Sequence, residues 1–170
     1  MTALIVVSGL PGTGKSTIAE HLARAIGAAH LSKDVFEAAL WRSGITRDSG
    51  AGWAAYEQLG AVAEAQLLLG LAVVLDSVTP NERIRSGWRD VAARTAARFV
   101  AIECVCPDEG LHRSRLGGRI RNIAGWPEVT WEQVVDIRSR YEPWTGDHLV
   151  VDATQPMSDN LAAVEAYVRA

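Results

Sequence analysis

The feature that most constrains this chain is a glycine-rich segment, residues 8–17, which directly follows the apolar run 3–7. It reads SGLPGTGKST, in which a glycine is followed after four residues by glycine, lysine and serine. This spacing is the P-loop pattern, in which a strand leads through a glycine-rich turn into a helix. Glycines let successive backbone N–H groups turn inward on a polyphosphate, and the positive end of the helix dipole adds to the same cradle. The alternative is a chance glycine-rich connector between a strand and a helix.

The motif assigns roles to individual residues. Lys15 is expected to reach the β- and γ-phosphates of a nucleotide, and the Ser16 hydroxyl is expected to bind Mg²⁺. The other predicted phosphate-binding residues are Gly12, Thr13, Gly14 and Thr17.

Length and composition bound the class of protein. A chain of 170 residues fits one domain with a buried core, so residues 1–170 are expected to form a single domain. Apolar residues make up 48% of the chain, without an apolar run near the ~18 residues that a membrane-spanning helix needs. The amino terminus shows no signal-peptide pattern, which predicts a cytoplasmic protein without a membrane partner. Cys104 and Cys106 are too close for an ordinary disulfide and are predicted to be core thiols rather than a functional pair.

Strand-like and helix-like segments alternate along the chain, which is typical of a parallel α/β sheet covered by helices on both faces. The expected strands are 3–8, 28–32, 71–77, 99–106 and 149–152. The expected helices are 15–26, 35–41, 53–69, 81–97, 107–116, 130–141 and 158–170. Thr79 with Pro80, Thr130 and Ser158 are the predicted caps of three of these helices. Ligands bind such sheets at the carboxyl ends of the strands, so a site is expected there.

Two acidic residues stand at the ends of expected strands. Asp34 could hold an acceptor hydroxyl in line with the γ-phosphate and take its proton. Its alternative role is the N-cap of the helix that is expected from Val35, and both roles can hold together. Asp76 ends a buried strand and resembles the acid that supports Mg²⁺ through water in P-loop proteins. A cap or turn former is the alternative for Asp76.

Positive charge is concentrated in one part of the chain. Between residues 83 and 121, nine arginines stand against four acidic residues, a local net charge of +5 in a chain of net charge −3. This asymmetry favours a site for one polyanionic ligand over an extended nucleic-acid surface. Arg115, Arg119 and Arg121 flank a glycine pair, which predicts an arginine-bearing lid at about 117–129. A solvated arginine helix is the alternative.

The segment at about 38–56 is the predicted acceptor-binding insertion, because turn formers interrupt its helical pattern. Trp41 and Trp53 flank the interruption and could stack on a ring or sugar, although tryptophan is more often a core residue. Lys33 is expected to be a solvated flank of Asp34. The four histidines are expected to be structural or at the surface.

Four segments together resemble the small P-loop kinases. They are GLPGTGKST at 9–17, LSKD at 31–34, VVLDS at 73–77 and RLGGR at 115–119. This group includes shikimate, gluconate and nucleoside monophosphate kinases, chloramphenicol phosphotransferase, polynucleotide 5′-kinase and zeta toxins. The resemblance covers essentially the whole chain in the order of its elements, and its P-loop is highly specific for phosphate binding.

The resemblance implies a three-layer P-loop NTPase fold with a five-stranded parallel sheet of order 2-3-1-4-5. It also implies ATP with Mg²⁺ and a small-molecule hydroxyl acceptor. By motif position, Asp34 matches the acceptor-orienting aspartate, Arg115 the arginine that packs on adenine, and Arg119 the first lid arginine. Thr154, in the segment DAT at 152–154, resembles the segment beside the base.

The sequence therefore predicts an ATP-dependent phosphotransferase that acts on a hydroxyl of a small metabolite or natural product, with antibiotics and sugars as candidates. Lys15, Asp34 and Arg119 are the predicted catalytic residues, and Ser16 and Asp76 are the predicted metal ligands. The protein is expected to be a monomer or a homodimer.

Two other functions stay open. The nucleic-acid kinases of this group carry an arginine shortly after the aspartate, whereas Phe36 and Glu37 stand here, so a nucleic-acid partner is not expected. A polynucleotide or toxin-type kinase is the alternative within enzymes. A nucleotide-dependent switch or ATPase is the alternative from another class.

Overall fold

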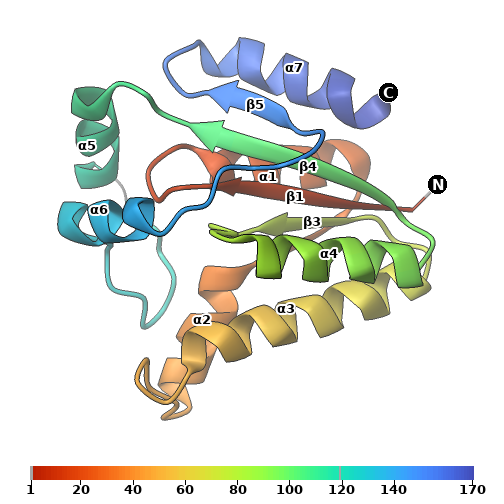
Figure 1. Ribbon diagram of the computed structural model, residues 1–170, viewed down its shortest axis with the longest axis horizontal. Coiled ribbons are helices and arrows are strands. Elements are labelled where there is room, and N and C mark those ends of the chain that lie inside the picture. Colours follow the sequence, from red (N-terminus) through yellow and green to blue (C-terminus); the bar gives the residue numbers. More distant parts are fainter. Residues whose placement is uncertain (1, 119) are drawn as a thin grey trace.

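The computed structural model of the chain describes residues 2–118 and 120–170. Five parallel strands form one sheet in the order β2-β3-β1-β4-β5, which confirms the expected α/β fold and its strand order (Figure 1). The strands are β1 Ala3–Gly9, β2 Ala29–Ser32, β3 Val73–Asp76, β4 Arg98–Val105 and β5 Leu149–Asp152. All seven residues of the central strand β1 are buried, because helices cover both faces of the sheet.

The helices pack in two layers on the sheet (Figure 1). They are α1 Lys15–Ile26, α2 Lys33–Arg42, α3 Ala51–Leu68, α4 Glu82–Arg94, α5 Glu109–Gly117, α6 Trp131–Ser139 and α7 Met157–Arg169. Successive side chains of a strand point to opposite faces. Ile5 and Val7 of β1 therefore pack with α1 and α7, whereas Leu4 and Val6 pack with α3 and α4.

The strand register brings several carboxyl ends to one edge of the sheet. Asp76 of β3 pairs with Val7 of β1 and with Ser32 of β2, and Gly9 pairs with Cys104 of β4. The loops that follow these strands meet at this edge, on the left of Figure 1. The candidate site is built from these loops.

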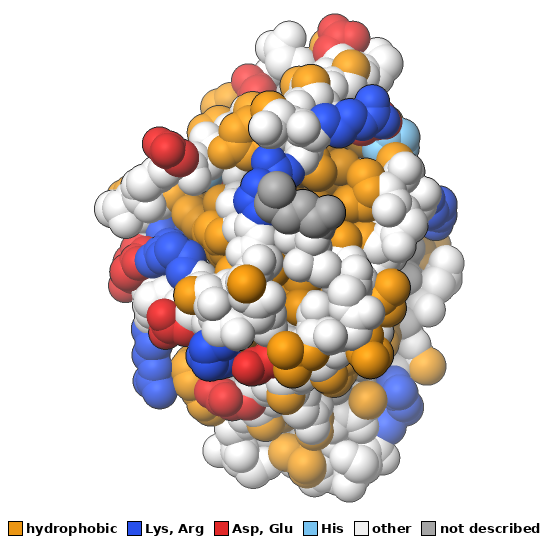
Figure 2. Space-filling view, turned by 90° about the vertical axis from the view of Figure 1, so that its right-hand side faces the viewer, with side chains coloured by type: hydrophobic (Ala, Val, Ile, Leu, Met, Phe, Trp, Pro, Cys, Tyr) orange, Lys and Arg blue, Asp and Glu red, His pale blue; other side chains and the backbone are white. Residues whose placement is uncertain are grey.

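The opposite side of the molecule, where the strands begin, has a surface of mixed character. Acidic and basic side chains are interspersed there with hydrophobic ones (Figure 2). Within the described ranges, every helix is too short or too polar to cross a lipid bilayer.

Of the three helix caps that the sequence predicted, one is confirmed and two are wrong. Thr130 caps α6 with a full capping box, as predicted. Asn81, rather than Thr79 with Pro80, caps α4, and its side chain accepts a hydrogen bond from the N–H of Ile84 at 3.1 Å. Thr79 cannot cap this helix because its hydroxyl is buried and lies 2.6 Å from the Ser77 hydroxyl. The last helix begins at Met157, so the prediction of Ser158 as its cap was also wrong.

A fully buried arginine joins two loops near the candidate site. The Arg85 guanidinium donates hydrogen bonds to the carbonyls of Thr79 at 3.3 Å, Pro143 at 2.7 Å and Glu142 at 2.6 Å. It also lies 4.4 Å from the ring centroid of Trp144. The three carbonyls and the ring compensate for the desolvation of the charge, so Arg85 fixes the loop after β3 to the segment after α6.

Replacing Arg85 with methionine is expected to lower the free energy of unfolding by about 3 kcal/mol, because three carbonyls, of which that of Thr79 is buried, lose their charged donor. Urea denaturation measures this loss. Arg89→Met is the matched control on the same helix, since Arg89 is more than a third exposed and pairs with Glu82 at the surface. Its expected loss is below about 0.5 kcal/mol. Equal losses in the two variants would show that the Arg85 contacts do not stabilise the fold.

Candidate functional site

The segment between β1 and α1 has the backbone geometry of a phosphate cradle. Gly9, Gly12 and Gly14 have φ angles of 135°, 89° and 88°, which side chains rarely permit. A Cβ on Gly9 would lie 2.2 Å from the carbonyl oxygen of Cys104, so the strand packing also demands glycine there. The helix that begins at Lys15 has Gly14 at its N-cap and no side-chain cap. The amino end of this helix could therefore bind an anion.

A cavity of about 460 Å³ opens over this cradle. Most of the predicted nucleotide-binding residues line it, together with one arginine from the predicted lid. These residues are Gly12, Gly14, Lys15, Ser16, Thr17, Arg115 and Arg121. The fold therefore brings P-loop residues and two arginines, which are about 100 positions apart in the sequence, to one cavity.

Two predicted residues, Thr13 and Thr154, lie outside this lining, and a third is not described. Thr13 turns to the other side of the loop, where its hydroxyl donates to the carbonyl of Leu10 at 2.9 Å. Thr154 is exposed in the turn after β5, and its N–H donates to Oδ1 of Asp152 at 2.8 Å. Arg119 lies outside the described residues. The roles of all three stay predictions.

Asp34 lies in the first turn of α2 and reaches the P-loop through Arg121. Nη1 of Arg121 is 2.9 Å from Oδ2 of Asp34 and donates to Oγ of Ser16 at 3.1 Å. α2 begins at Lys33 with Ser32 at its N-cap, so Asp34 does not cap a helix starting at Val35. The Asp34 carboxylate and the Ser16 hydroxyl are therefore both within hydrogen-bonding distance of the same nitrogen atom.

Asp76, at the end of β3, has the environment of a residue that supports a cation. It is 2% exposed, and neither carboxylate oxygen has a hydrogen-bond partner. Nη2 of Arg121 lies 3.9 Å and Nε2 of His30 lies 4.0 Å from Oδ2 of this carboxylate. A buried carboxylate without hydrogen bonds is costly unless a cation or water satisfies it. Asp76 and Ser16 therefore fit the hard, oxygen-binding Mg²⁺ ion, with water between Asp76 and the metal.

Lys33 is not the solvated flank that the sequence suggested. Its side chain is 14% exposed, forms an ion pair with Glu37 and lies 5.2 Å from the centroid of the Tyr56 ring. Burial raises the pKa of Tyr56 well above its ordinary value. The spacing of four between Lys33 and Glu37 was a signal for this pair, but only the packing of α3 buries it.

His112 supports the P-loop from behind, a role that the sequence gave no specific reason to assign. It is 1% exposed, and its Nε2 lies 2.7 Å from the carbonyl oxygen of Pro11. Burial lowers the pKa of His112, which favours a neutral ring whose Nε2–H donates to this carbonyl. The edge of Trp131 packs on the same ring, with the ring centroids 5.2 Å apart.

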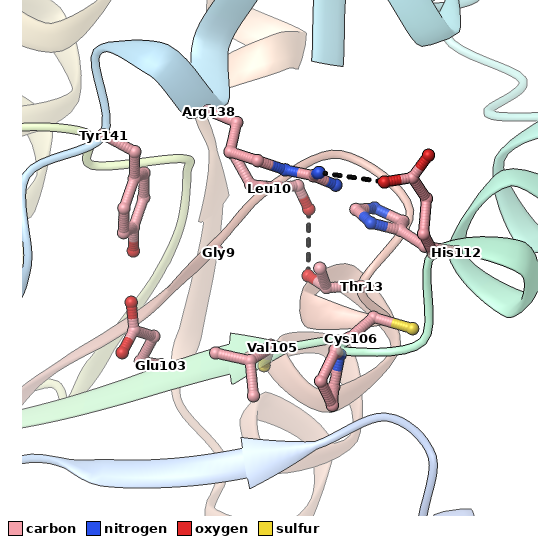
Figure 3. A pocket seen from close by; sticks show the side chains of 12 residues that line it. Gly9, Leu10, Thr13, Glu103, Val105, Cys106, His112, Arg138 and Tyr141 are labelled. Atoms are coloured by element: carbon pink, nitrogen blue, oxygen red, sulfur yellow. Dashed lines mark hydrogen bonds and ion pairs between the residues drawn. The ribbon is translucent and has the colours of Figure 1, made fainter. Parts of the chain in front are cut away.

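His112 also borders a second cavity of about 380 Å³, which lies behind the P-loop (Figure 3). Figure 3 shows Tyr141 and Arg138 of the α6 region on one side and Glu103 and Val105 of β4 on the other. Burial raises the pKa of Tyr141 to about 12, so its phenol stays protonated at neutral pH.

The position of His112 predicts an acid-sensitive stability. Because the pKa of the folded state is lowered, the unfolded state binds more protons as pH falls below about 6.5. The stabilisation from neutral His112 is thus complete above about pH 6.5 and is lost on acidification. Urea denaturation at pH 7.5 and 5.5 measures this loss, and His112→Phe is expected to lose less stability between the two. An identical pH dependence in both proteins would contradict this assignment.

The end of α2 is joined to the predicted lid. Trp41 and Trp126 stack with their ring centroids 4.9 Å apart and their planes at 6°. The Arg42 guanidinium donates to the carbonyl of Ala124, and Arg47 covers Trp41 at 4.6 Å. The predicted acceptor-binding range 38–56 thus comprises the end of α2, the connection 43–50 and the start of α3.

Several other arginines of the basic segment make contacts within the fold, away from this cavity. Arg94 binds Glu64 through two hydrogen bonds, and Arg98 donates to the carbonyl of Val168. Arg83 covers the ring of Trp53 at 4.0 Å. Part of the positive charge of this segment therefore lies outside the nucleotide cavity.

Comparisons with known proteins give a family and a fold. A family described as AAA domain matches residues 4–144. The uncharacterised protein Rv2004c of Mycobacterium tuberculosis is 29% identical over 162 residues, which are 86% of this chain and 31% of that protein. The chain therefore spans about a third of the length of the first curated relatives. The adenylyl-sulfate kinase of Erwinia tasmaniensis is 26% identical over 171 residues, covering 94% of this chain and 82% of the enzyme.

Solved structures of kinases share the fold. A sugar kinase from Janibacter sp. HTCC2649 superposes with a TM-score of 0.74 at 20% identity, over 99% of this chain and 95% of that one. The APS kinase CysC of Mycobacterium tuberculosis, in complex with AMPPNP and APS, gives a TM-score of 0.68 at 23% identity, over 99% and 98%. At these identities the likeness shows that the chain has the same fold as these kinases.

Proposed function

The chain belongs to the AAA domain family, and on this premise we propose that it is an ATP-dependent phosphotransferase acting on a hydroxyl of a small metabolite or natural product. The observation that carries the proposal is the joint placement of Asp34 and Ser16 at one guanidinium nitrogen. A P-loop alone serves kinases, motors and switches. A partly buried carboxylate facing the P-loop supplies what a kinase needs in addition, a group that can position an acceptor hydroxyl.

The donor half of the site consists of the P-loop and the start of α1. Backbone N–H groups from Gly12 to Thr17 would surround the β-phosphate, and Lys15 would reach the β- and γ-phosphates. Arg115, which lines the cavity, would pack on the adenine, with Thr154 beside the base. Ser16 and Asp76 would hold Mg²⁺, which neutralises charge on the phosphates when it is bound.

The acceptor half of the site is assigned to Asp34. Its carboxylate would accept a hydrogen bond from the acceptor hydroxyl and take up the proton as the transfer proceeds. The acceptor oxygen forms a new bond to the γ-phosphorus, the bond from that phosphorus to the β–γ bridging oxygen breaks, and ADP leaves. Arg119 of the lid would stabilise the charge on the transferring group.

The names of the compared kinases support a small acceptor. One is called a sugar kinase and another an adenylyl-sulfate kinase. The residues after Asp34 support the same choice, because Phe36 and Glu37 stand where the nucleic-acid kinases of this group carry an arginine. Since the first curated relatives are about three times longer than this chain, the activity of the whole proteins is a separate question.

A panel of acceptors tests the proposed function. ADP release is measured with ATP and Mg²⁺ against hydroxylated metabolites, aminoglycosides and nucleosides, and phosphorylated products are identified by mass spectrometry. A phosphate ester formed on at least one small acceptor is the expected result. Steady hydrolysis that no acceptor accelerates would favour a nucleotide-dependent switch, and transfer only to oligonucleotides would favour a polynucleotide kinase.

A further inference from the structure

We infer that Arg121 holds the magnesium position in the nucleotide-free protein and must withdraw before a metal ion can bind there. The inference rests on the proposed function, because the metal position is the one expected between Ser16 and Asp76. Arg121 was not among the predicted catalytic residues. Because its guanidinium would occupy the metal position, the metal ion could bind only after the guanidinium has moved.

The guanidinium group of Arg121 lies close to four oxygen-bearing side chains at this edge of the sheet. Nη1 of Arg121 lies 2.9 Å from Oδ2 of Asp34 and 3.1 Å from Oγ of Ser16. Nη2 lies 3.3 Å from Oγ of Ser32 and 3.9 Å from Oδ2 of Asp76. The side chain is only 10% exposed. Arg121 therefore lies between the P-loop and the ends of β2 and β3.

The charges at this point require a cation. The Asp34 side chain is 15% exposed and that of Asp76 is 2% exposed, so both carboxylates are largely removed from water. Two buried carboxylates without positive charge nearby would be strongly destabilising. The Arg121 guanidinium forms an ion pair with both of them and supplies this charge within the chain.

Arg121 and a metal ion exclude each other at Ser16. The Ser16 hydroxyl oxygen accepts a hydrogen bond from Nη1, and this oxygen would bind Mg²⁺ at about 2.1 Å. Two cations at one hydroxyl would repel each other at close range. The Asp76 carboxylate lacks hydrogen bonds, because neither of its oxygen atoms has a hydrogen-bond partner even with Arg121 present. A small cation with its bound water would satisfy Asp76 better than the guanidinium does.

The position of Arg121 in the chain allows it to withdraw. It lies in the irregular segment between α5 and α6, so its side chain can move without unwinding a helix. Its own N–H donates to Oε1 of Glu128 at 2.9 Å, which anchors the backbone when the guanidinium leaves. Phosphate oxygens of an incoming nucleotide are the strongest new partners for it. A metal ion is therefore expected to enter with the nucleotide rather than before it.

Titration of Mn²⁺ into the nucleotide-free protein, followed by electron paramagnetic resonance of the free ion, tests this role. Arg121→Met is expected to bind Mn²⁺ about tenfold more tightly than the wild type, a usual size for coupling between two competing ligands. Arg42→Met is the matched control, because Arg42 binds the carbonyl of Ala124 in the same segment but not these carboxylates. Its Mn²⁺ affinity is expected to equal that of the wild type. An unchanged or weaker affinity in a folded Arg121→Met protein would overturn the inference.

A second variant covers the case in which Arg121→Met does not fold. Arg121→Lys keeps the charge but cannot contact two carboxylates with a planar fork, so it is expected to bind Mn²⁺ more tightly than the wild type by a smaller factor. Wild-type affinity in this variant would again overturn the inference. The titration contains neither ATP nor acceptor, so it is independent of phosphoryl transfer. A tenfold difference without transfer to any acceptor would count against the proposed function alone, and transfer without the difference would count against the role of Arg121 alone.

Discussion

Lys15→Ala is expected to reduce kcat/KM for ATP by about three orders of magnitude, which corresponds to about 4 kcal/mol of transition-state stabilisation. Lys15 is 3% exposed, lines the nucleotide cavity and begins the helix whose amino end faces it. Its ammonium group would act on phosphates in a largely water-excluded site, where a charge contributes more than it does in water. Coupled measurement of ADP release with the best acceptor of the panel determines the loss.

Lys33→Gln is the matched control, because Lys33 is the other lysine of the chain and is also mostly buried. Its ion pair with Glu37 contributes to stability, so this variant is expected to melt at a lower temperature while it retains most of its activity. Equal losses of activity in the two lysine variants would remove the specific role of Lys15.

Asp34→Asn is expected to lower kcat by a factor of about 10² to 10⁴, the usual contribution of a general base. Asparagine has nearly the same shape but accepts no proton, so the variant separates chemistry from packing. The affinity for ATP, measured by calorimetry, is expected to change far less than kcat, because the role proposed for Asp34 concerns the acceptor hydroxyl rather than the nucleotide. An Asp34→Asn protein with the kcat of the wild type would exclude Asp34 from the mechanism.

Glu37→Gln provides the comparison for Asp34 within the same helix. Glu37 lies about one turn further along α2, is buried, and pairs with Lys33 rather than with Arg121. Its replacement is expected to lower the melting temperature and to leave kcat within about threefold of the wild type. If both variants lose kcat equally, α2 acts through its general position rather than through the Asp34 carboxylate.

The fold was predictable from the sequence because its signals are local. The apolar residues of β1 and the glycines at 12 and 14 each depend on neighbours close in sequence, and so does the capping box at Thr130. Such patterns mark strands, tight turns and helix starts without knowledge of the tertiary contacts. The predicted nucleotide cavity then followed from the rule that parallel strands present their carboxyl ends at one edge.

Residues whose roles depend on contacts between distant segments were not predictable in the same way. Arg85 looks like one more arginine on an exposed helix face, yet it is fully buried against carbonyls 57 and 58 positions away. His112 reaches Pro11 across 101 positions, and Arg121 reaches Ser16 across 105. The sequence placed three arginines near a lid, but only the folded chain shows that Arg121 meets Asp34.

The contact between α2 and the segment after α5 limits which parts of this protein can be exchanged with those of a relative. Trp41 is stacked on Trp126, and Arg42 holds the carbonyl of Ala124 next to Gly125, where a Cβ would lie 3.1 Å from Cγ of Arg42. If α2 of a relative replaced this helix alone, it would lack these contacts with the segment after α5. We therefore expect a chimaera that exchanges 33–56 to fold well only if it also carries 122–127 from the same donor.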